Sequence, residues 1–191
     1  MATLMERAIG AAKLDATVYE DVESDPGALG QAMTVVVVAS VATGLGSGAA
    51  SGGIGFGLVG GVIGALIGWF VWAFTAWFVG TKMLPEPETK ADFNQLLRTT
   101  GFASAPGVAG ILGFVPGVGG LILFGVSLWQ LAAMVVAVRQ ALDYSSTGRA
   151  VLVCVIGFVI QLVIIFLVVG LVMGTAAALF GGATAPATLA P

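Results

Sequence analysis

Histidine is absent from the 191 residues, cysteine occurs once, and only 9% of the residues are charged. The lack of histidine excludes histidine-based triads, HExxH zinc sites and histidine-ligated haem. The one thiol, Cys154, forms no disulfide within the chain, and its apolar surroundings are typical of a core residue. The net charge of −3 excludes a strongly basic surface for nucleic acid. We therefore expect no enzyme, no metal, no cofactor and no nucleic-acid partner.

Charge is missing from most of the chain's length. The seven basic and ten acidic residues lie within 1–25, 82–98 and 139–149, so uncharged runs of 56, 40 and 42 residues remain. A soluble domain carries roughly 25% charged residues, far more than this chain. A membrane-spanning helix needs about 20 consecutive apolar residues, and the uncharged runs are long enough to provide them. The alternating segments of about ten residues that build transmembrane β-barrels are not visible, so the spans are expected to be helices.

The sequence thus predicts an all-α polytopic membrane protein with five transmembrane helices. The predicted spans are 28–45, 54–79, 93–115, 121–138 and 150–173. Asp25 and Pro26 are typical of the start of the first helix, and the glycine- and serine-rich residues 44–53 predict a turn after it. The small residues of 174–191 predict a disordered tail.

Proline and glycine interrupt the second uncharged run. Pro106 and four glycines weaken its first half, and Pro116 with Gly117 breaks its middle. An α-helix over 101–115 would be about 22 Å long, shorter than the ~30 Å hydrocarbon core, and a start near Asp92 would lengthen it. Residues 101–120 therefore belong either to two full spans or to a re-entrant hairpin.

The first 25 residues contain no signal-peptide core and are expected to stay in the mature protein as a cytosolic segment. An apolar edge repeats at helical spacing, which predicts an amphipathic helix. Its members are Leu4, Met5, Ala8, Ile9 and Ala12. The local charge of −4 argues against binding to anionic lipid. The segment either lies at the membrane interface or docks on the protein's own loops or on a partner.

The charges also predict the orientation. Short loops that carry lysine and arginine stay on the cytoplasmic side. Five spans with a cytoplasmic N-terminus and an outside C-terminus put all seven basic residues on the cytoplasmic side of the membrane, which is expected to be the cytoplasmic (inner) membrane.

Small residues recur every four positions in the predicted spans, a spacing that lets helix backbones approach closely. These glycines are Gly53, Gly57 and Gly61, then Gly60, Gly64 and Gly68, then Gly170 and Gly174. They are expected either to pack the protein's own helices or to form a seam for a second copy or another membrane protein. The amides of Gln31, Gln130 and Gln161 are expected to bond between helices.

A short motif gives the chain a family resemblance. Gly101-Phe102-x-x-x-Pro106 is similar to the Gly-Tyr-x-x-x-Pro motif in the third span of the Yip (Ypt-interacting protein) domain family, here in its bacterial form. The segments around Arg139 and Arg149 resemble the same family, over about 14–172. The Asp-Leu-Tyr-Gly-Pro motif of eukaryotic members, which are associated with small GTPases and membrane traffic, is absent. The resemblance implies a five-span, non-enzymatic membrane protein whose cytosolic segment contacts partners.

Two function classes follow. The first is a membrane scaffold or adaptor, or an accessory subunit of a larger membrane complex, with membrane lipids and another membrane protein or a second copy as partners. The second is a small channel or a lipid- or solute-translocating protein, which the interrupted segment 101–120 favours. The uncharged runs hold no acidic or basic side chain, which counts against proton-coupled transport.

Overall fold

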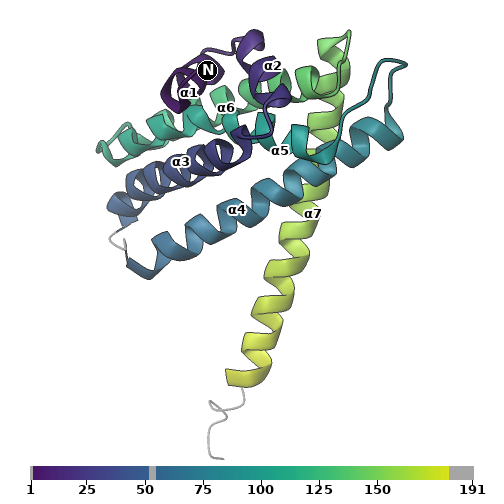
Figure 1. Ribbon diagram of the computed structural model, residues 1–191. Helices are drawn as coiled ribbons and strands as arrows, with labels where there is room; N and C mark the ends of the chain where they lie inside the picture. The colour runs from purple at the N-terminus through teal and green to yellow at the C-terminus, as the bar shows by residue number, and fades with distance from the viewer. Residues whose placement is uncertain (1, 52–54, 181–191) are drawn as a thin grey trace, which may run out of the picture. The chain divides into compact units, whose positions relative to one another are not determined.

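A computed structural model describes the backbone of residues 2–51 and 55–180, and their side chains except at 49–57 and 176–180. All of its described elements are helices (Figure 1). They are α1 (Leu4–Ala12), α2 (Ala16–Ser24), α3 (Ala28–Ser51), α4 (Gly55–Phe78), the π-helix η1 (Val79–Met83), α5 (Phe93–Phe102), the 3₁₀-helix η2 (Ala105–Phe114), α6 (Gly119–Ala141) and α7 (Thr147–Phe180). The predicted all-α class is confirmed.

The chain divides into two compact units, residues 1–157 and 158–191. The first unit is a bundle in which α3 packs against α4, α5 and η2, while α2 packs against α5 and α6. Its core consists largely of small side chains, which allow the helices to approach closely. Buried members of this core are Ala28, Ala32, Val35, Phe102, Ala133 and Ala137, together with Tyr19 and Val22 of α2.

Four described helices, rather than the five predicted, are long and apolar enough to cross a membrane. The qualifying stretches are Ala28–Gly48, Leu58–Met83, Gly119–Ala141 and Thr147–Thr175. The chain is therefore a membrane protein by the length and composition of its helices. The missing one is the predicted third span, 93–115, because no single α-helix covers it.

Residues 93–115 form α5 followed by the 3₁₀-helix η2, and Pro106 explains the change. Proline lacks the N–H that an α-helix needs and clashes with the preceding turn, so it occurs near the start of the new helix. Ten residues rise about 20 Å as a 3₁₀-helix but about 15 Å as an α-helix. With α5, the pair reaches about 35 Å, more than the ~30 Å of a hydrocarbon core.

The pair α5–η2 runs alongside α3 in the same direction. A β-carbon on Gly101 would lie 2.7 Å from the β-carbon of Ala32, and one on Gly110 would lie 2.6 Å from Oγ1 of Thr43. The Thr43 hydroxyl also donates to the Gly107 carbonyl at 3.1 Å. These glycines are needed because any side chain there would separate the two elements.

Helix α3 is longer than predicted, since 44–51 are helical where a turn was expected. The cause is packing rather than propensity. Gly46 is buried, and a β-carbon on it would collide with the backbone carbonyl of Gly110. Backbone contact of this kind stabilises a helical glycine that in isolation would cost about 1 kcal/mol relative to alanine.

The observed ends of the other long helices lie closer to the predicted span boundaries. Helices α4, α6 and α7 correspond to the predicted spans 54–79, 121–138 and 150–173, and α6 and α7 extend beyond them. Helix α7 continues through Phe180, so 174–180 are helical where disorder was predicted. Residues 181–191 of that predicted tail lie outside the described residues.

Candidate functional site

The N-terminal segment forms a hairpin of α1 and α2 that is closed by its own hydrogen bonds. Thr3 and Glu6 form a capping box at the start of α1, and Asp15 caps α2. The Tyr19 hydroxyl is buried and donates to the Ala11 carbonyl at 3.0 Å. Burial raises the pKa of that hydroxyl, which therefore stays protonated. The segment is thus a folded unit rather than a loose arm.

Arg7 joins this hairpin to the first long helix. Arg7 is 3% exposed, and its guanidinium lies 2.8 Å from carboxylate oxygens of both Asp21 and Asp25. It also donates to Oε1 of Gln31 in α3 at 3.1 Å. The Arg7 hydrogen bond, followed by the Gly27 N–H, holds the pKa of Asp25 below its usual range. One arginine therefore connects α1, α2 and α3.

Three further side chains, which together donate four hydrogen bonds, fix the hairpin to α5 and α6. Arg98 of α5 is buried and donates to the carbonyls of Val22, at 3.0 Å, and Glu23. These are last-turn carbonyls of α2, where a cation is also favoured by the helix dipole. At α6, Trp129 Nε1 donates to the Ala12 carbonyl at 2.7 Å, and Gln140 donates to Glu20 at 3.0 Å. The side of the hairpin that contacts α5 and α6 is therefore covered by helices of the same protein.

One carboxyl at this junction has an unusual environment. Burial, the largest cause, raises the pKa of Glu23 to about 7 from an ordinary 4.5. The charges that act on it are Asp143, Arg98, Glu20 and Asp92, and only Arg98 opposes the rise. The docked hairpin therefore favours the protonated form of Glu23.

We expect Glu23→Gln to stabilise the docked hairpin increasingly as the pH rises from about 5 to about 8. In the wild type the Glu23 carboxyl must ionise in its half-buried position over this window, which costs about 1 kcal/mol after allowance for solvent screening. Hydrogen exchange of the α2 amides measures the effect. Glu88→Gln, at an exposed acid of the 84–92 loop, is the matched control. Its α2 amides should exchange as in the wild type at every pH in this window. Equal behaviour of the two variants would contradict this role for Glu23.

The two other charged stretches form a second polar cluster. Tyr144, next to α6, donates from its hydroxyl to the carbonyls of Gly80 at 3.1 Å and Leu84 at 2.8 Å. Glu86 accepts from the Ser145 N–H at 3.0 Å and pairs with Arg149 at 3.2 Å. These partners, the Ser145 N–H first, lower the pKa of Glu86. Loops 84–92 and 142–146 are thereby joined.

The structure brings some of the sequence-predicted residues into these clusters. Arg139 donates to the carbonyls of Tyr144 and Ser145, each at 3.3 Å, so it shapes the same loop. Phe102 and Pro106 are fully buried. Gly101 lies against Ala32, as described above. The predicted family motif thus has a packing role between α3, α5 and η2.

The predicted glycine ridges behave differently. In α4, no described residue beyond the adjoining helix backbone has a heavy atom within 4 Å of the β-carbon position of Gly60, Gly61 or Gly64, so these glycines pack against no described helix of their own unit. Gly68 is half-buried in the same helix. Gly53 and the surroundings of Gly57 lie outside the described residues. Gly170 and Gly174 lie in α7 within the second unit.

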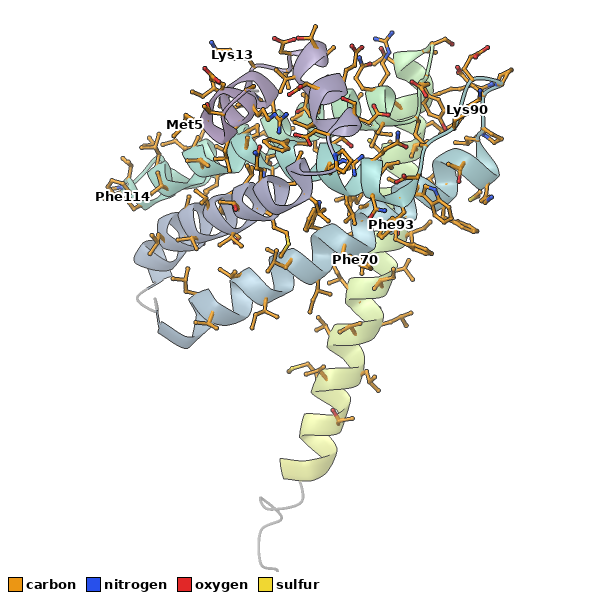
Figure 2. All side chains as sticks on the ribbon, in the orientation of Figure 1. Met5, Lys13, Phe70, Lys90, Phe93 and Phe114 are labelled. Atoms are coloured by element: carbon orange, nitrogen blue, oxygen red, sulfur yellow. The ribbon has the colours of Figure 1, made fainter. Side chains whose placement is uncertain are left out.

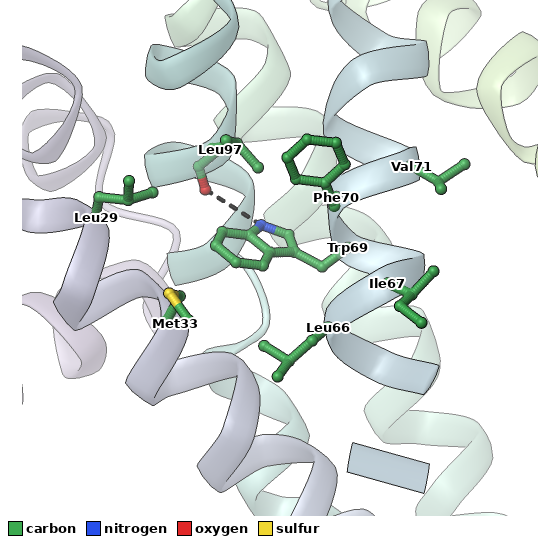
Figure 3. A pocket seen from close by; sticks show the side chains of 8 residues that line it. All are labelled: Leu29, Met33, Leu66, Ile67, Trp69, Phe70, Val71 and Leu97. Atoms are coloured by element: carbon green, nitrogen blue, oxygen red, sulfur yellow. Dashed lines mark hydrogen bonds between the residues drawn. The ribbon is translucent and has the colours of Figure 1, made fainter. Parts of the chain in front are cut away.

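An aromatic region borders the same helix. Phe70, Phe74 and Trp77 of α4 surround Phe93 of α5, with ring centroids 5.0–6.5 Å apart. Figure 2 labels Phe70 and Phe93 on this side of the bundle. Next to it, α3, α4 and α5 enclose an apolar groove of about 410 Å³ (Figure 3). Its indole, Trp69, donates to the Leu97 carbonyl at 3.2 Å.

The amides have internal partners where they are described within the first unit. Gln31 accepts from Arg7, and Gln130 donates to the Ser104 carbonyl at 3.4 Å. Gln161 lies in the second unit. Among residues 2–51 and 55–180, no cluster of three or more acidic, cysteine or histidine side chains is placed to hold a metal ion.

Comparison with known proteins gives one match. No curated protein and no solved structure matches the chain. A family model described as the Yip1 domain matches residues 15–170, a range that contains α2 to α6, the Gly101–Pro106 motif and most of α7. The resemblance noted from that motif is confirmed, and the chain belongs to the Yip1 domain family.

Proposed function

We propose that this Yip1-family membrane protein is a non-enzymatic scaffold or adaptor that associates with another membrane protein or with a second copy of itself. An accessory subunit of a larger membrane complex is the same proposal with a larger partner. The observation that carries it is the open face of α4. On this face Gly60 and Gly64 contact no other described element, and they lie beside exposed apolar side chains. These side chains are Val59, Ile63, Ile67, Phe70 and Phe74.

The free glycines favour this function for a physical reason. Glycine within a helix costs about 1 kcal/mol relative to alanine, and in α3 that cost is offset by contact with η2. In α4 the described first unit offers no such contact at Gly60, Gly61 or Gly64. Close approach of a partner helix is what small residues four apart permit in a membrane.

The proposed orientation has the polar end of the first unit in the cytoplasm. This end comprises the loops 84–92 and 142–146, with the α1–α2 hairpin beside it at the membrane interface, and the seven basic residues lie in or next to these segments. The length of α5–η2 and its course beside α3 support a third crossing made by two helix types. Five crossings then leave the C-terminus outside, in agreement with the positive-inside rule.

Transport has weaker support. A pore or translocation path would need free polar groups along the spans. Gln31 and Gln130, two of the three amides in the uncharged runs, are engaged within the first unit. The scaffold therefore accounts for more of the described contacts.

Cross-linking in native membranes tests the proposal. In a Cys154→Ser background, Gly64→Cys should form cross-links to a second chain or to another membrane protein. Leu121→Cys, at the 73% exposed Leu121 of α6, is the matched control and should form few. Equal cross-linking at the two positions would overturn the α4 face as the contact.

A further inference from the structure

An apolar groove of about 310 Å³ lies between α1, α3 and η2. Ala8 and Ile9 of α1 form one wall, Val38 of α3 the second, and Val108 of η2 the third. The family match begins at residue 15, so the α1 wall lies outside the matched domain. We propose that this groove binds one acyl chain of a membrane phospholipid whose phosphate lies at Lys13.

The lining excludes water and polar ligands. Its one side chain with a polar group is Thr34, whose hydroxyl donates to the Gly30 carbonyl at 2.9 Å. A water molecule needs two to four polar partners, and this surface has none to offer. An apolar chain is the occupant that such a lining stabilises.

The groove opens on the side of the bundle that faces lipid. Val38 and Val108 are 47% and 43% exposed, in elements argued above to cross the membrane. Met5 and Ile9, one turn apart on α1, are 65% and 47% exposed. An apolar helix face open to this degree is typical of a helix embedded at the membrane interface. Acyl chains are therefore the molecules that surround the groove.

Lys13 supplies the charge that a phosphate requires. It follows Ala12, a lining residue, is exposed, and makes no ion pair within the described residues. Figure 2 shows Lys13 and Met5 on the outside of α1. The neighbouring Asp15 carboxylate accepts from the N–H and hydroxyl of Thr17. A lysine at the end of an apolar helix extends to the headgroup layer, where all phospholipids carry phosphate.

Native mass spectrometry of the purified full-length protein tests this proposal, with phosphatidylethanolamine and diacylglycerol of the same chains as probes. We expect the wild type to retain one phosphatidylethanolamine in preference to diacylglycerol. Ala8→Trp should fill the groove and lower retention by at least about tenfold, which corresponds to the loss of about two methylene contacts. Lys13→Gln should retain a lipid but lose the preference for the phosphate-containing one.

Met33→Trp is the control. Met33 lines the groove of Figure 3, on the other side of α3, so this variant should keep the lipid. Equal retention in wild type and Ala8→Trp would overturn the proposal, as would equal loss in Met33→Trp. If Ala8→Trp does not fold, the test is made on the wild type instead. A diazirine-labelled phosphatidylethanolamine is photo-cross-linked to the protein, and the labelled residues are identified. Adducts at α1 and Val108 support the groove, whereas adducts spread over all exposed apolar residues, or a peptide found in the groove, contradict it. These outcomes are independent of cross-linking at Gly64.

Discussion

Gly46→Ala is expected to destabilise the protein by about 2–3 kcal/mol, although alanine is the better helix former. A methyl group on Gly46 collides with the backbone carbonyl of Gly110, and a carbonyl in a helix cannot move aside as a side chain can. The two elements α3 and η2 must then separate over their whole contact. Thermal unfolding in detergent or in nanodiscs measures the loss.

Gly64→Ala is the matched control for that experiment, and its effect should have the opposite sign. Gly64 also lies within a long apolar helix, but no described residue from another element has an atom within 4 Å of its β-carbon position. Alanine there should leave stability unchanged or raise it by up to about 1 kcal/mol. If both variants lose the same stability, the close approach of α3 and η2 is not what holds the first unit together.

Arg7→Ala is expected to release the N-terminal hairpin at a cost of about 2–3 kcal/mol. This cost is at or below the lower end of the values for breaking a buried ion pair, because the carboxylates of Asp21 and Asp25 are partly exposed. The change leaves Asp21 and Asp25 facing each other without a cation and removes the bond to Gln31. Hydrogen exchange of the α1 and α2 amides should become markedly faster, while that of α6 changes little.

Two variants control for the Arg7 substitution. Lys13→Ala removes a basic residue of the same segment that is exposed and makes no ion pair within the described residues, and it should leave exchange in α2 unchanged. Arg7→Lys keeps the charge but provides a single ammonium group for three acceptors, so it should fall between wild type and Arg7→Ala. Protection in Arg7→Ala as strong as in Lys13→Ala would contradict the connecting role of Arg7.

Much of the fold could be predicted from the sequence, because long apolar runs have few ways to satisfy their backbone groups. The helices α3, α4, α6 and α7 follow from the uncharged runs, and Pro106 indicated that the first half of the second run is weakened as an α-helix. The change from an α-helix to a 3₁₀-helix at Pro106 could not be predicted. Whether a proline starts a loop or a 3₁₀-helix depends on the neighbour, here the glycine-bearing side of α3.

The contacts of the polar residues were the least predictable part. Arg7 and Arg98 appear in the sequence only as charges, yet each is buried against partners 14 to 76 residues away. The one local signal for Arg7 is its place beside the apolar edge of α1. The spacing of the glycines did not identify those that pack the first unit. Gly60, Gly61 and Gly64 of the predicted set have no neighbour from another described element, whereas Gly46 and Gly110, which were not in that set, lie in contact.

The mass of the native particle tests the central claim most directly. Extraction of the protein from its own membrane in polymer nanodiscs, without detergent, preserves lateral contacts between helices. We expect particles that contain this chain together with a second copy or another membrane protein, and we expect Gly64→Leu to reduce them to a single chain of unchanged thermal stability. A single chain in the wild-type particle, or a particle unaffected by Gly64→Leu, would contradict a scaffold that associates through the open face of α4.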